Sequence, residues 1–315
     1  MKKLLYIFLA FGLFFSCSEN KENDLDKENL NGEVKSVYTA SFEAIEKFGE
    51  VTKGYKKWDI SWESDTKFIY DDKGNLIERS SYDKDGELTS TTKYKYDDKG
   101  NEIENTSYNK DGELNYKQRY KYDDKGNLIE WSSYDKDGEL TSKTKYKYDD
   151  KGNLIEWSIY NEDGELYYKE RYKYDDKGNL IESSSYVEDG ELDYKKRYKY
   201  DDKAIELDPN DAIECSVYNK YGELDYKERY KYDDKGNLIE WSRYDKDGEL
   251  SKRRKYKYDD KGNLIEYKKY DKPNTLDGEK TYEYQFDDNK NWIQKIIFID
   301  NKPTFIVERE IKYYD

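Results

Sequence analysis

The sequence has no histidine, three prolines, two cysteines and one methionine in 315 residues. Without histidine, the chain lacks both the usual general base near neutral pH and the commonest metal ligand. Two cysteines are too few for a disulfide framework. These absences argue against an enzyme, so we expect no catalytic residues, no cofactor and no metal site.

The chain also lacks an excess of positive charge. It holds 57 lysines and arginines against 72 aspartates and glutamates, a formal net charge of −15. Proteins bind phosphate backbones through clustered cations, so we expect no nucleic-acid partner. Hydrophobic residues are only 34% of the chain, which excludes a thick aliphatic core. Aromatic residues reach 17% in strict register, which favours a folded chain over a disordered one.

The one long apolar run lies at the N-terminus, over residues 4–15 after a cationic start. It is too short to span a bilayer as a mature helix and is typical of an export signal. The run meets Ser16 and Cys17, which resemble a bacterial lipobox, although Phe14 replaces the usual aliphatic residue. We predict a lipoprotein signal peptide over residues 1–16 and lipidation of Cys17. The alternative is an ordinary signal peptide that contains a cysteine.

Residues 17–32 are polar and acidic, without a periodic apolar face, and predict a flexible lipid-anchored tether. Ser18 fits the sorting of lipoproteins to the outer membrane. The acidic stretch resembles the one that carries Bacteroidetes lipoproteins to the cell surface. We therefore expect a bacterial outer-membrane lipoprotein, held to the membrane by its lipid and placed on the cell surface in preference to the periplasmic face.

From Tyr70 onward a unit of 26 residues recurs, and each unit contains two words of the form Tyr-Asp-x-x-Gly-x-Leu. The glycine of each word is expected to take a positive φ in a tight hairpin, and the aspartate to accept local backbone N–H groups. A fixed period of this length indicates a repeat architecture. The leading tyrosines are Tyr70, Tyr96, Tyr122, Tyr148, Tyr174 and Tyr200, and then Tyr232 and Tyr258.

Alternation along the strands predicts two different faces of the sheet. If every hairpin loop has three residues, one face is a tyrosine and leucine ladder and the other a lysine surface with isoleucine and tryptophan. The first face would hold Leu128, Tyr134, Leu140, Tyr146, Tyr148 and Leu154, and the second Ile129, Trp131, Lys143, Lys145, Lys147, Ile155 and Trp157.

The predicted fold is all-β, an antiparallel β-hairpin repeat ribbon. So many sequential strands accumulate twist, so we expect the ribbon to coil into a spiral or a partly closed shell, with an elongated single-layer sheet as the alternative. The predicted parts are an N-terminal β cap over 33–67, the repeats over 68–285 with a loop insertion near 204–212, and a C-terminal β cap over 286–315.

The repeated words, with a second tyrosine two residues upstream as in Tyr146 and Tyr148, resemble the YD-repeat, or Rhs-repeat, family over about residues 68–292. That resemblance implies long hairpin ribbons that wind into hollow shells. The chain departs from the family in having few repeats, no recognisable toxin cargo and no self-cleavage core. The fold is therefore carried over as an expectation, and toxin delivery is not. The repeats are also similar to the aromatic hairpins of choline- and glucan-binding modules.

One position in the repeat, directly after Ile-Glu, holds an aromatic residue in several units and predicts a ligand platform. Arg79, Asn105, Ser183 and Cys215 fill it in other units. The alternative is partial burial of large side chains on a curved sheet. The candidate platform residues are Trp131, Trp157, Trp241 and Tyr267.

Three other features receive structural interpretations. The Asp-x-Asp-Gly words are shared with calcium loops but lack the further oxygen ligands, so they predict turns. The insertion near 204–212 predicts a bulged loop. Cys215 has no histidine to activate it and is predicted to be inert.

The leading functional hypothesis is a cell-envelope lipoprotein whose aromatic β-ribbon is a binding or adhesion surface for a carbohydrate or for an envelope or host protein. A structural spacer without a specific ligand is the second hypothesis. A glycan-active enzyme is a remote third, because carboxylate pairs are abundant everywhere and none is singled out. The sequence leaves the oligomeric state open.

Overall fold

The computed structural model describes residues 23–57, 65–200, 212–272 and 275–315. The signal peptide, Cys17 and nearly all of the insertion lie outside this part of the chain. The elements are α1 (Asp24–Lys27), β1 (Val34–Lys47), β2 (Glu50–Lys56), β3 (Thr66–Tyr70), β4 (Leu76–Tyr82), β5 (Leu88–Tyr96), β6 (Glu102–Asn109), β7 (Leu114–Tyr122), β8 (Leu128–Tyr134), β9 (Leu140–Tyr148), β10 (Leu154–Asn161), β11 (Leu166–Tyr174), β12 (Leu180–Val187), β13 (Leu192–Lys199), β14 (Glu214–Asn219), β15 (Leu224–Tyr232), β16 (Leu238–Asp245), β17 (Leu250–Tyr258), β18 (Leu264–Lys272), β19 (Thr275–Phe286), β20 (Trp292–Ile299) and β21 (Lys302–Tyr313).

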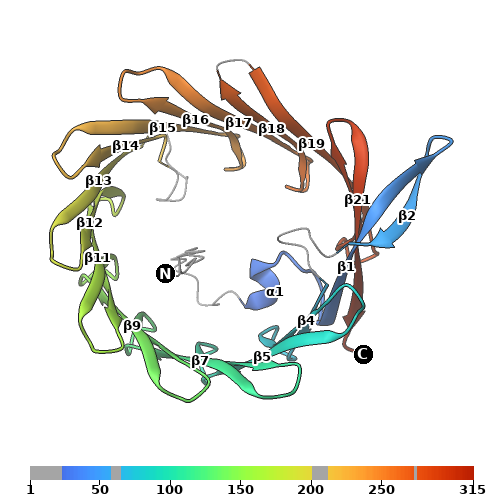
Figure 1. Cartoon of the computed structure of the whole chain (residues 1–315), viewed down its shortest axis with the longest axis horizontal. Coiled ribbons are helices and arrows are strands. Elements are labelled where there is room, and N and C mark those ends of the chain that lie inside the picture. Colours follow the sequence, from blue (N-terminus) through green and yellow to red (C-terminus); the bar gives the residue numbers. More distant parts are fainter. Residues whose placement is uncertain (1–22, 58–64, 201–211, 273–274) are drawn as a thin grey trace.

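The strands form one antiparallel sheet that closes on itself (Figure 1). From β3 to β21 each strand pairs with the next along the chain, and β1 completes the ring because it pairs with both β3 and β21. Val37 lies opposite Phe68 on one side and Ile311 on the other. Within the described residues the ring has 20 strands, and β2 pairs with β1 and projects away from the ring.

Closure makes the expected fold wrong in its main point. The chain is all-β and hairpin-built as predicted, but it is neither an open spiral, a partly closed shell nor an elongated single-layer sheet. The ring closes because of the two segments predicted to be caps, residues 33–67 and 286–315. Rather than covering exposed edges, β1 and β21 pair through a register that runs from Val34–Tyr313 to Glu43–Phe305, which removes both edges.

The hairpin turns are built as the repeated words predict. In the turn 149–153, the Asp149 Oδ1 accepts the backbone N–H of Lys151 at 3.0 Å and of Asn153 at 2.8 Å. Gly152 follows with φ +91°. The aspartates therefore act within their own turns. The turns 71–75, 97–101, 123–127, 149–153, 175–179, 233–237, 259–263 and 287–291 gather at one end of the barrel, here called the DDKGN rim, and 83–87, 109–113, 135–139, 161–165, 187–191, 219–223 and 245–249 at the other, the DKDGE rim.

The predicted division into a tyrosine face and a tryptophan face is wrong. The register shifts between Leu154 and Glu156, so that Tyr148 faces Leu154 but Lys147 faces Glu156 and Tyr146 faces Trp157. A β-bulge of this kind places an extra residue in one strand and reverses the alternation beyond it. Tyrosine and tryptophan consequently share one face, and the lysines share the other with glutamate.

The outward face carries a belt of ion pairs that recurs from unit to unit. Glu104 lies 2.8 Å from the Lys95 Nζ on one neighbouring strand and 3.1 Å from the Arg119 Nε on the other. The same arrangement recurs at Glu130, Glu156, Glu182, Glu214 and Glu240, while Glu266 pairs with Lys257 on the neighbouring strand and with Lys268 on its own. Each unit also has an outward tyrosine, four residues after this glutamate. Cations cover several of these rings, for example the Arg119 guanidinium 5.6 Å from the Tyr134 ring centre.

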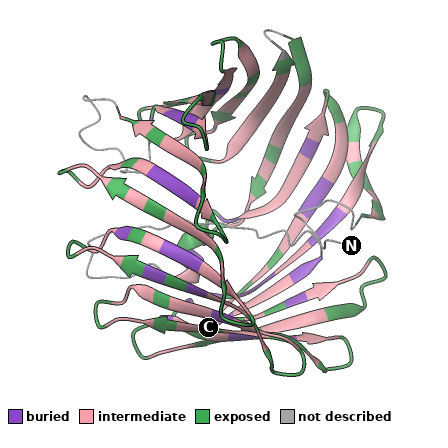
Figure 2. Cartoon of the chain, turned by 60° about the vertical axis from the view of Figure 1, so that its left-hand side comes forward, coloured by how far each residue is buried: buried purple, intermediate pink, exposed green. Residues whose placement is uncertain are grey.

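Burial is limited to short stretches, most of them in the strands, while most turn residues are exposed (Figure 2). One buried cluster joins Leu25 and Leu30 to Val34, Val37 and Tyr70. The other joins Tyr146, Leu154 and Trp157. The barrel is thus stabilised by local side-chain packing along its wall.

The described part of the predicted tether, residues 23–32, is folded rather than extended. α1 lies inside the ring near the DDKGN rim (Figure 1), where the backbone N–H groups of Asp24 and Leu25 donate to the Gly74 carbonyl. Asn23 and Asp26 form a capping box. Leu25 packs into the buried cluster with Val37 and Tyr70. This role could not be read from the sequence, because Leu25 is flanked by charged residues. None of the described helices is long and apolar enough to cross a membrane.

Candidate functional site in the barrel interior

The interior face is identified by α1. The Tyr96 hydroxyl donates to the Asp24 Oδ2 of α1 at 2.8 Å, so the face that carries Tyr96 points inward. Inward tyrosines at the same position of other units donate to backbone carbonyls on the preceding, neighbouring strand, as from Tyr148 to Leu128 and from Tyr174 to Leu154, each at 2.8 Å. Burial raises the pKa of Tyr174 to about 12. These tyrosines fasten neighbouring hairpins together and stay neutral at physiological pH.

The inward side chains that differ between units occur in directly opposed pairs. The position after Ile-Glu lies opposite a second variable position on the following strand. The pairs are Arg79–Thr92, Asn105–Gln118, Trp131–Thr144, Trp157–Glu170, Ser183–Lys196, Cys215–Glu228, Trp241–Arg254 and Tyr267–Lys280.

The outward face is uniform by comparison. The glutamate next to each variable position is the same in every unit, as in Glu130, Glu156 and Glu240. The outward residues are thus nearly constant from unit to unit, whereas the paired inward residues vary. The side chains that differ in chemistry therefore lie inside the barrel. Barrels of 16–18 strands already leave an aqueous channel, and this ring is wider. The interior is therefore the candidate functional site.

Two of the four predicted platform residues belong to the packed wall. Trp157 is 7% exposed, and its Nε1 donates to the Tyr172 hydroxyl at 2.7 Å. Its ring centre lies 5.1 Å from that of Tyr168. Trp131 packs against the same cluster and is half-buried. Trp157 is consequently a packing residue, and Trp131 presents only part of its surface.

The other two platform residues lie on β16 and β18, with β17 between them. Trp241 is half-buried, with the guanidinium carbons of Arg254 and Arg243 4.7 Å and 5.4 Å from its ring centre. The Tyr267 ring lies 5.5 Å from that of Tyr256. The structure therefore divides the predicted platform into a pair in the Trp157 cluster and a half-buried pair on β16 and β18, where cations lie beside Trp241.

A polar cluster lies between these two groups, on β13 to β16. The Arg243 Nη2 lies 2.7 Å from the Glu228 Oε1, and the Tyr230 hydroxyl donates to the Glu228 Oε2 at 2.6 Å. Cys215 is 3% exposed, and burial raises the pKa of its thiol to about 11, so it stays protonated at neutral pH. Lys196 is half-buried among inward tyrosines.

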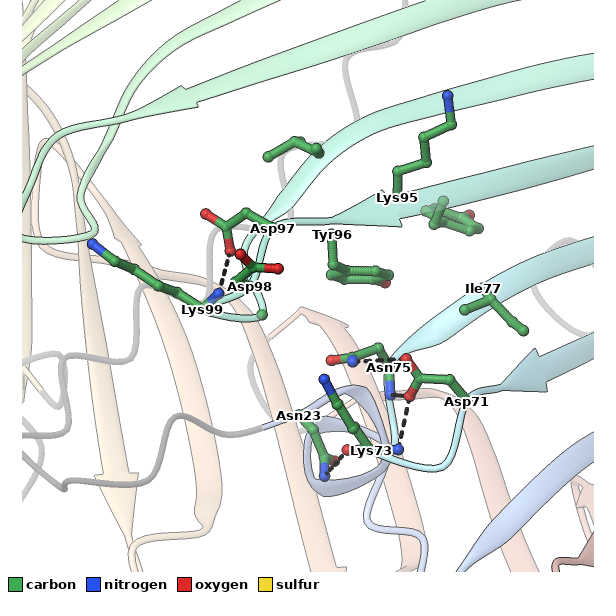
Figure 3. A pocket seen from close by; sticks show the side chains of 13 residues that line it. Asn23, Asp71, Lys73, Asn75, Ile77, Lys95, Tyr96, Asp97, Asp98 and Lys99 are labelled. Carbon is green, nitrogen blue, oxygen red and sulfur yellow. Dashed lines mark hydrogen bonds between the residues drawn. The ribbon is translucent and has the colours of Figure 1, made fainter.

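Two clefts flank the N-terminal segment at the DDKGN rim. One, of about 670 Å³, is lined by Asn23, Ile77, Tyr94 and Tyr96 and by the turns 71–75 and 97–101 (Figure 3). The other, of about 720 Å³, lies between residues 26–31 and the turns from 237 to 291. In the second cleft the Arg309 guanidinium covers the Trp292 ring at 3.6 Å. Both clefts are polar as well as aromatic.

Sequence reasoning missed the opposed partners, including Glu170, Lys196, Glu228 and Arg254. These partners could have been found in the same way as the tryptophan position, because each occupies a fixed position of the repeat at which the residue type varies between units. Only the register, which depends on the bulges, shows that the two variable positions face each other. Within the described residues, no group of histidine, cysteine, aspartate or glutamate side chains is arranged to hold a metal.

No known protein family matches the sequence, and no curated protein matches it. Solved structures resemble parts of the fold. A crystal structure of TcdB2-TccC3 is 15% identical, with a TM-score of 0.32, over 90% of this chain and 17% of that one. A porin-like protein from Bacteroides uniformis is 10% identical, with a TM-score of 0.33, over 90% of this chain and 99% of that one. The Photorhabdus luminescens Tc holotoxin pore is 12% identical, with a TM-score of 0.23, over 78% and 19%. The chain thus spans less than a fifth of the first of these and nearly all of the second.

Proposed function

We propose that this protein is an outer-membrane lipoprotein, displayed on the cell surface, whose barrel interior binds a carbohydrate. The observation that carries the proposal is the placement of the variable repeat positions as opposed pairs inside the barrel. Aromatic rings such as Trp241 and Tyr267, next to amide and charged side chains, suit a ligand with both apolar faces and hydroxyl groups. The outer wall varies too little between units to distinguish ligands.

The charged exterior supports attachment through a lipid. A barrel that crosses a bilayer presents an apolar band to the acyl chains. Here the outward face has glutamates paired with lysine and arginine in successive units, as at Glu156 with Lys147 and Arg171. Burying such charges in hydrocarbon is costly. Lipidated Cys17 is the proposed membrane attachment.

Lipidation at Cys17 would also orient the barrel. Only six residues lead from Cys17 to Asn23, so the lipid attaches within about 20 Å of that residue. The Asn23 Nδ2 donates to the Lys73 carbonyl at the DDKGN rim. The DDKGN rim then faces the membrane, and the DKDGE rim is the side from which a ligand enters.

Protease shaving of intact cells tests the location, with Cys17→Ala as the control for anchoring. Loss of the repeats from intact cells supports surface display. Protection until the outer membrane is broken contradicts it and favours the structural spacer of the periplasmic face.

Binding is tested with a glycan array probed by the full-length protein. Trp241→Ala is expected to reduce retention of the bound glycan, because it removes a half-buried inward ring. Tyr244→Ala is the matched control, since Tyr244 lies outward beneath the Arg229 guanidinium at 5.0 Å. Equal effects of the two substitutions, or no glycan bound by the parent protein, would contradict an interior carbohydrate site.

A further inference from the structure

One sector of the interior wall, on β16 to β19, is dense in cations although the whole chain is acidic. Its inward residues are Arg243, Lys252, Arg254, Lys269 and Lys280, and they surround Trp241 and Tyr267. This set of seven residues is called the cationic sector below. The chain as a whole has a net charge of −15, so this cluster of positive charge is a feature of one part of the inner wall and not of the whole protein.

The register places like charges directly opposite each other in this sector. Arg243 lies opposite Lys252 across β16 and β17, and Arg254 lies opposite Lys269 across β17 and β18. Directly opposed like charges destabilise an antiparallel pair. The same positions hold serine and tyrosine in other units, as in Ser185 opposite Tyr194, so the hairpin fold itself does not require the cations.

Carboxylates of the described residues neutralise only part of the cationic sector. Glu228 pairs with Arg243 at 2.7 Å, and Asp277 and Asp271 lie 2.7 Å and 3.0 Å from the Lys269 Nζ. Neither Lys252 nor Arg254 lies within ion-pair distance of a carboxylate in the described residues, and both side chains are exposed. The Arg254 guanidinium instead lies against the Trp241 ring. Exposed cations beside aromatic rings, inside a barrel, are arranged to receive an anion.

We propose that the cationic sector binds a carboxylate-bearing oligosaccharide, such as one built of uronic acids. This inference rests on the proposed interior carbohydrate site and names its ligand class. Guanidinium groups bind carboxylates through charge-assisted hydrogen bonds, and the Trp241 and Tyr267 rings stack on sugar faces. The sector extends from mid-barrel toward the DKDGE rim, because Arg243 lies two residues before the turn 245–249 and Lys252 three residues after it. They are the first cations of the sector on the path of a ligand that enters past this turn.

Nucleic acid fits the surroundings less well. The DKDGE rim is acidic, with Asp245, Asp247 and Glu249 in the adjoining turn. A long nucleic acid would bring one charge per nucleotide past this rim along its whole length, whereas a short uronate oligomer brings one carboxylate per sugar over a few units only and offers stacking faces.

Two adjacent arginines provide a matched test. Arg254 points inward, while Arg253 points outward and lies 4.6 Å from the Tyr270 ring centre. The experiment is calorimetric titration of the full-length protein in detergent with oligogalacturonate, its methyl-esterified neutral form and a single-stranded oligonucleotide. We expect the acidic sugar to bind, the esterified one to bind at least about tenfold more weakly, and binding to weaken as salt is raised.

Arg254→Ala and Arg254→Gln are each expected to weaken oligogalacturonate binding about tenfold or more, and Arg253→Ala to leave it unchanged. Circular dichroism of each variant establishes that the barrel is folded. Equal binding of the acidic and esterified sugars overturns the charge inference but leaves the carbohydrate proposal in place. Preference for the oligonucleotide, or equal effects of the Arg253 and Arg254 substitutions, also overturns the inference. Binding of no sugar at all overturns both.

Discussion

Tyr146 and Trp157 lie directly opposite each other on β9 and β10, and both side chains point into the barrel. They are 8% and 7% exposed, and Leu154 completes the cluster that they form. This contact belongs to the buried aromatic cluster of the repeat wall. It shows that the inward aromatic residues serve two purposes, stability in this sector and an accessible surface in the sector around Trp241.

Replacing Trp157 with alanine should therefore destabilise the barrel by about 3–5 kcal/mol, because it empties a packed site. Trp241→Ala should cost clearly less, since that ring is half-buried and flanked by exposed cations. Denaturant unfolding of both variants measures the difference. Tyr172→Phe provides a finer test: it removes the acceptor of the Trp157 Nε1 at 2.7 Å and should cost about 1–3 kcal/mol. Equal unfolding free energies for the two tryptophan variants would contradict the division of the platform.

The turn glycines should differ from a strand glycine in the sign of their response to alanine. Gly152 has φ +91° with nothing within 4 Å of an added Cβ, so Gly152→Ala should cost about 1–2 kcal/mol through backbone conformation alone. Gly278 has open space too but no positive φ. Gly278→Ala should be neutral or stabilise by up to about 1 kcal/mol. Thermal unfolding compares the two, and equal destabilisation by both would show that a positive φ does not govern the response.

Much of this fold can be predicted from the sequence because the determinants are local. The Tyr-Asp-x-x-Gly-x-Leu words specify turn, strand length and the self-capping aspartate, and Asp149 shows each of these as expected. Closure could not be predicted in this way. It depends on the pairing of β1 with β21, which are far apart in the sequence and lie outside the repeats. Local patterns specify a ribbon, and only the curvature accumulated over all the strands brings its ends together.

The site was predictable in part, for a related reason. Variation between units singled out Trp131, Trp157, Trp241 and Tyr267, but simple alternation placed them on the lysine face. A bulge in each of the four strand pairs, such as the one between Leu154 and Glu156, moves them to the tyrosine face. A one-residue shift reverses every side chain of a strand, so faces cannot be assigned from alternation unless the bulges are known. The same shift hid the opposed partner Arg254 of Trp241.

The outward glutamates should make stability depend on acid pH. The hydrogen bond from Lys95, with burial opposing it and Arg119 assisting, lowers the pKa of Glu104, and Lys121 likewise lowers the pKa of Glu130. The unfolded chain then binds protons at a higher pH than the folded one. Each contribution is present above the unfolded pKa of about 4.3 and is lost as pH falls through the folded value.

Unfolding temperature measured against pH should therefore fall steeply below about pH 4–5. Each exposed pair contributes only about 0–1 kcal/mol, so Glu130→Gln should produce a small loss at neutral pH that disappears in acid. High salt should reduce the neutral-pH effect of the substitution. A Glu130→Gln loss that persists unchanged at low pH would show that packing, rather than ion pairing, is the contribution of that side chain.

The position of α1 should depend on one carboxylate. The Asp24 Oδ2 accepts from the Tyr96 hydroxyl at 2.8 Å and from the Leu76 backbone N–H at 2.9 Å. Burial raises the pKa of Asp24, but its bonds with Lys27, Leu76 and Tyr96 outweigh that effect and lower the pKa overall. Docking is thus strongest above the unfolded pKa of about 3.9 and weakens as pH falls through the folded value.

Asp24→Ala should accordingly release residues 23–30 from the wall while the barrel itself stays folded. Hydrogen exchange is the measurement, with the Leu30 amide as reporter, because it donates to the Leu25 carbonyl at 2.9 Å only while this segment keeps its turn. We expect exchange to accelerate about tenfold or more, which corresponds to the loss of charge-assisted bonds at a partly buried site. Asp72→Ala, an exposed aspartate in the adjoining turn, is the matched control for charge. If Leu30 exchanges at the parent rate in Asp24→Ala, the apolar contact of Leu25 holds the segment and the carboxylate does not.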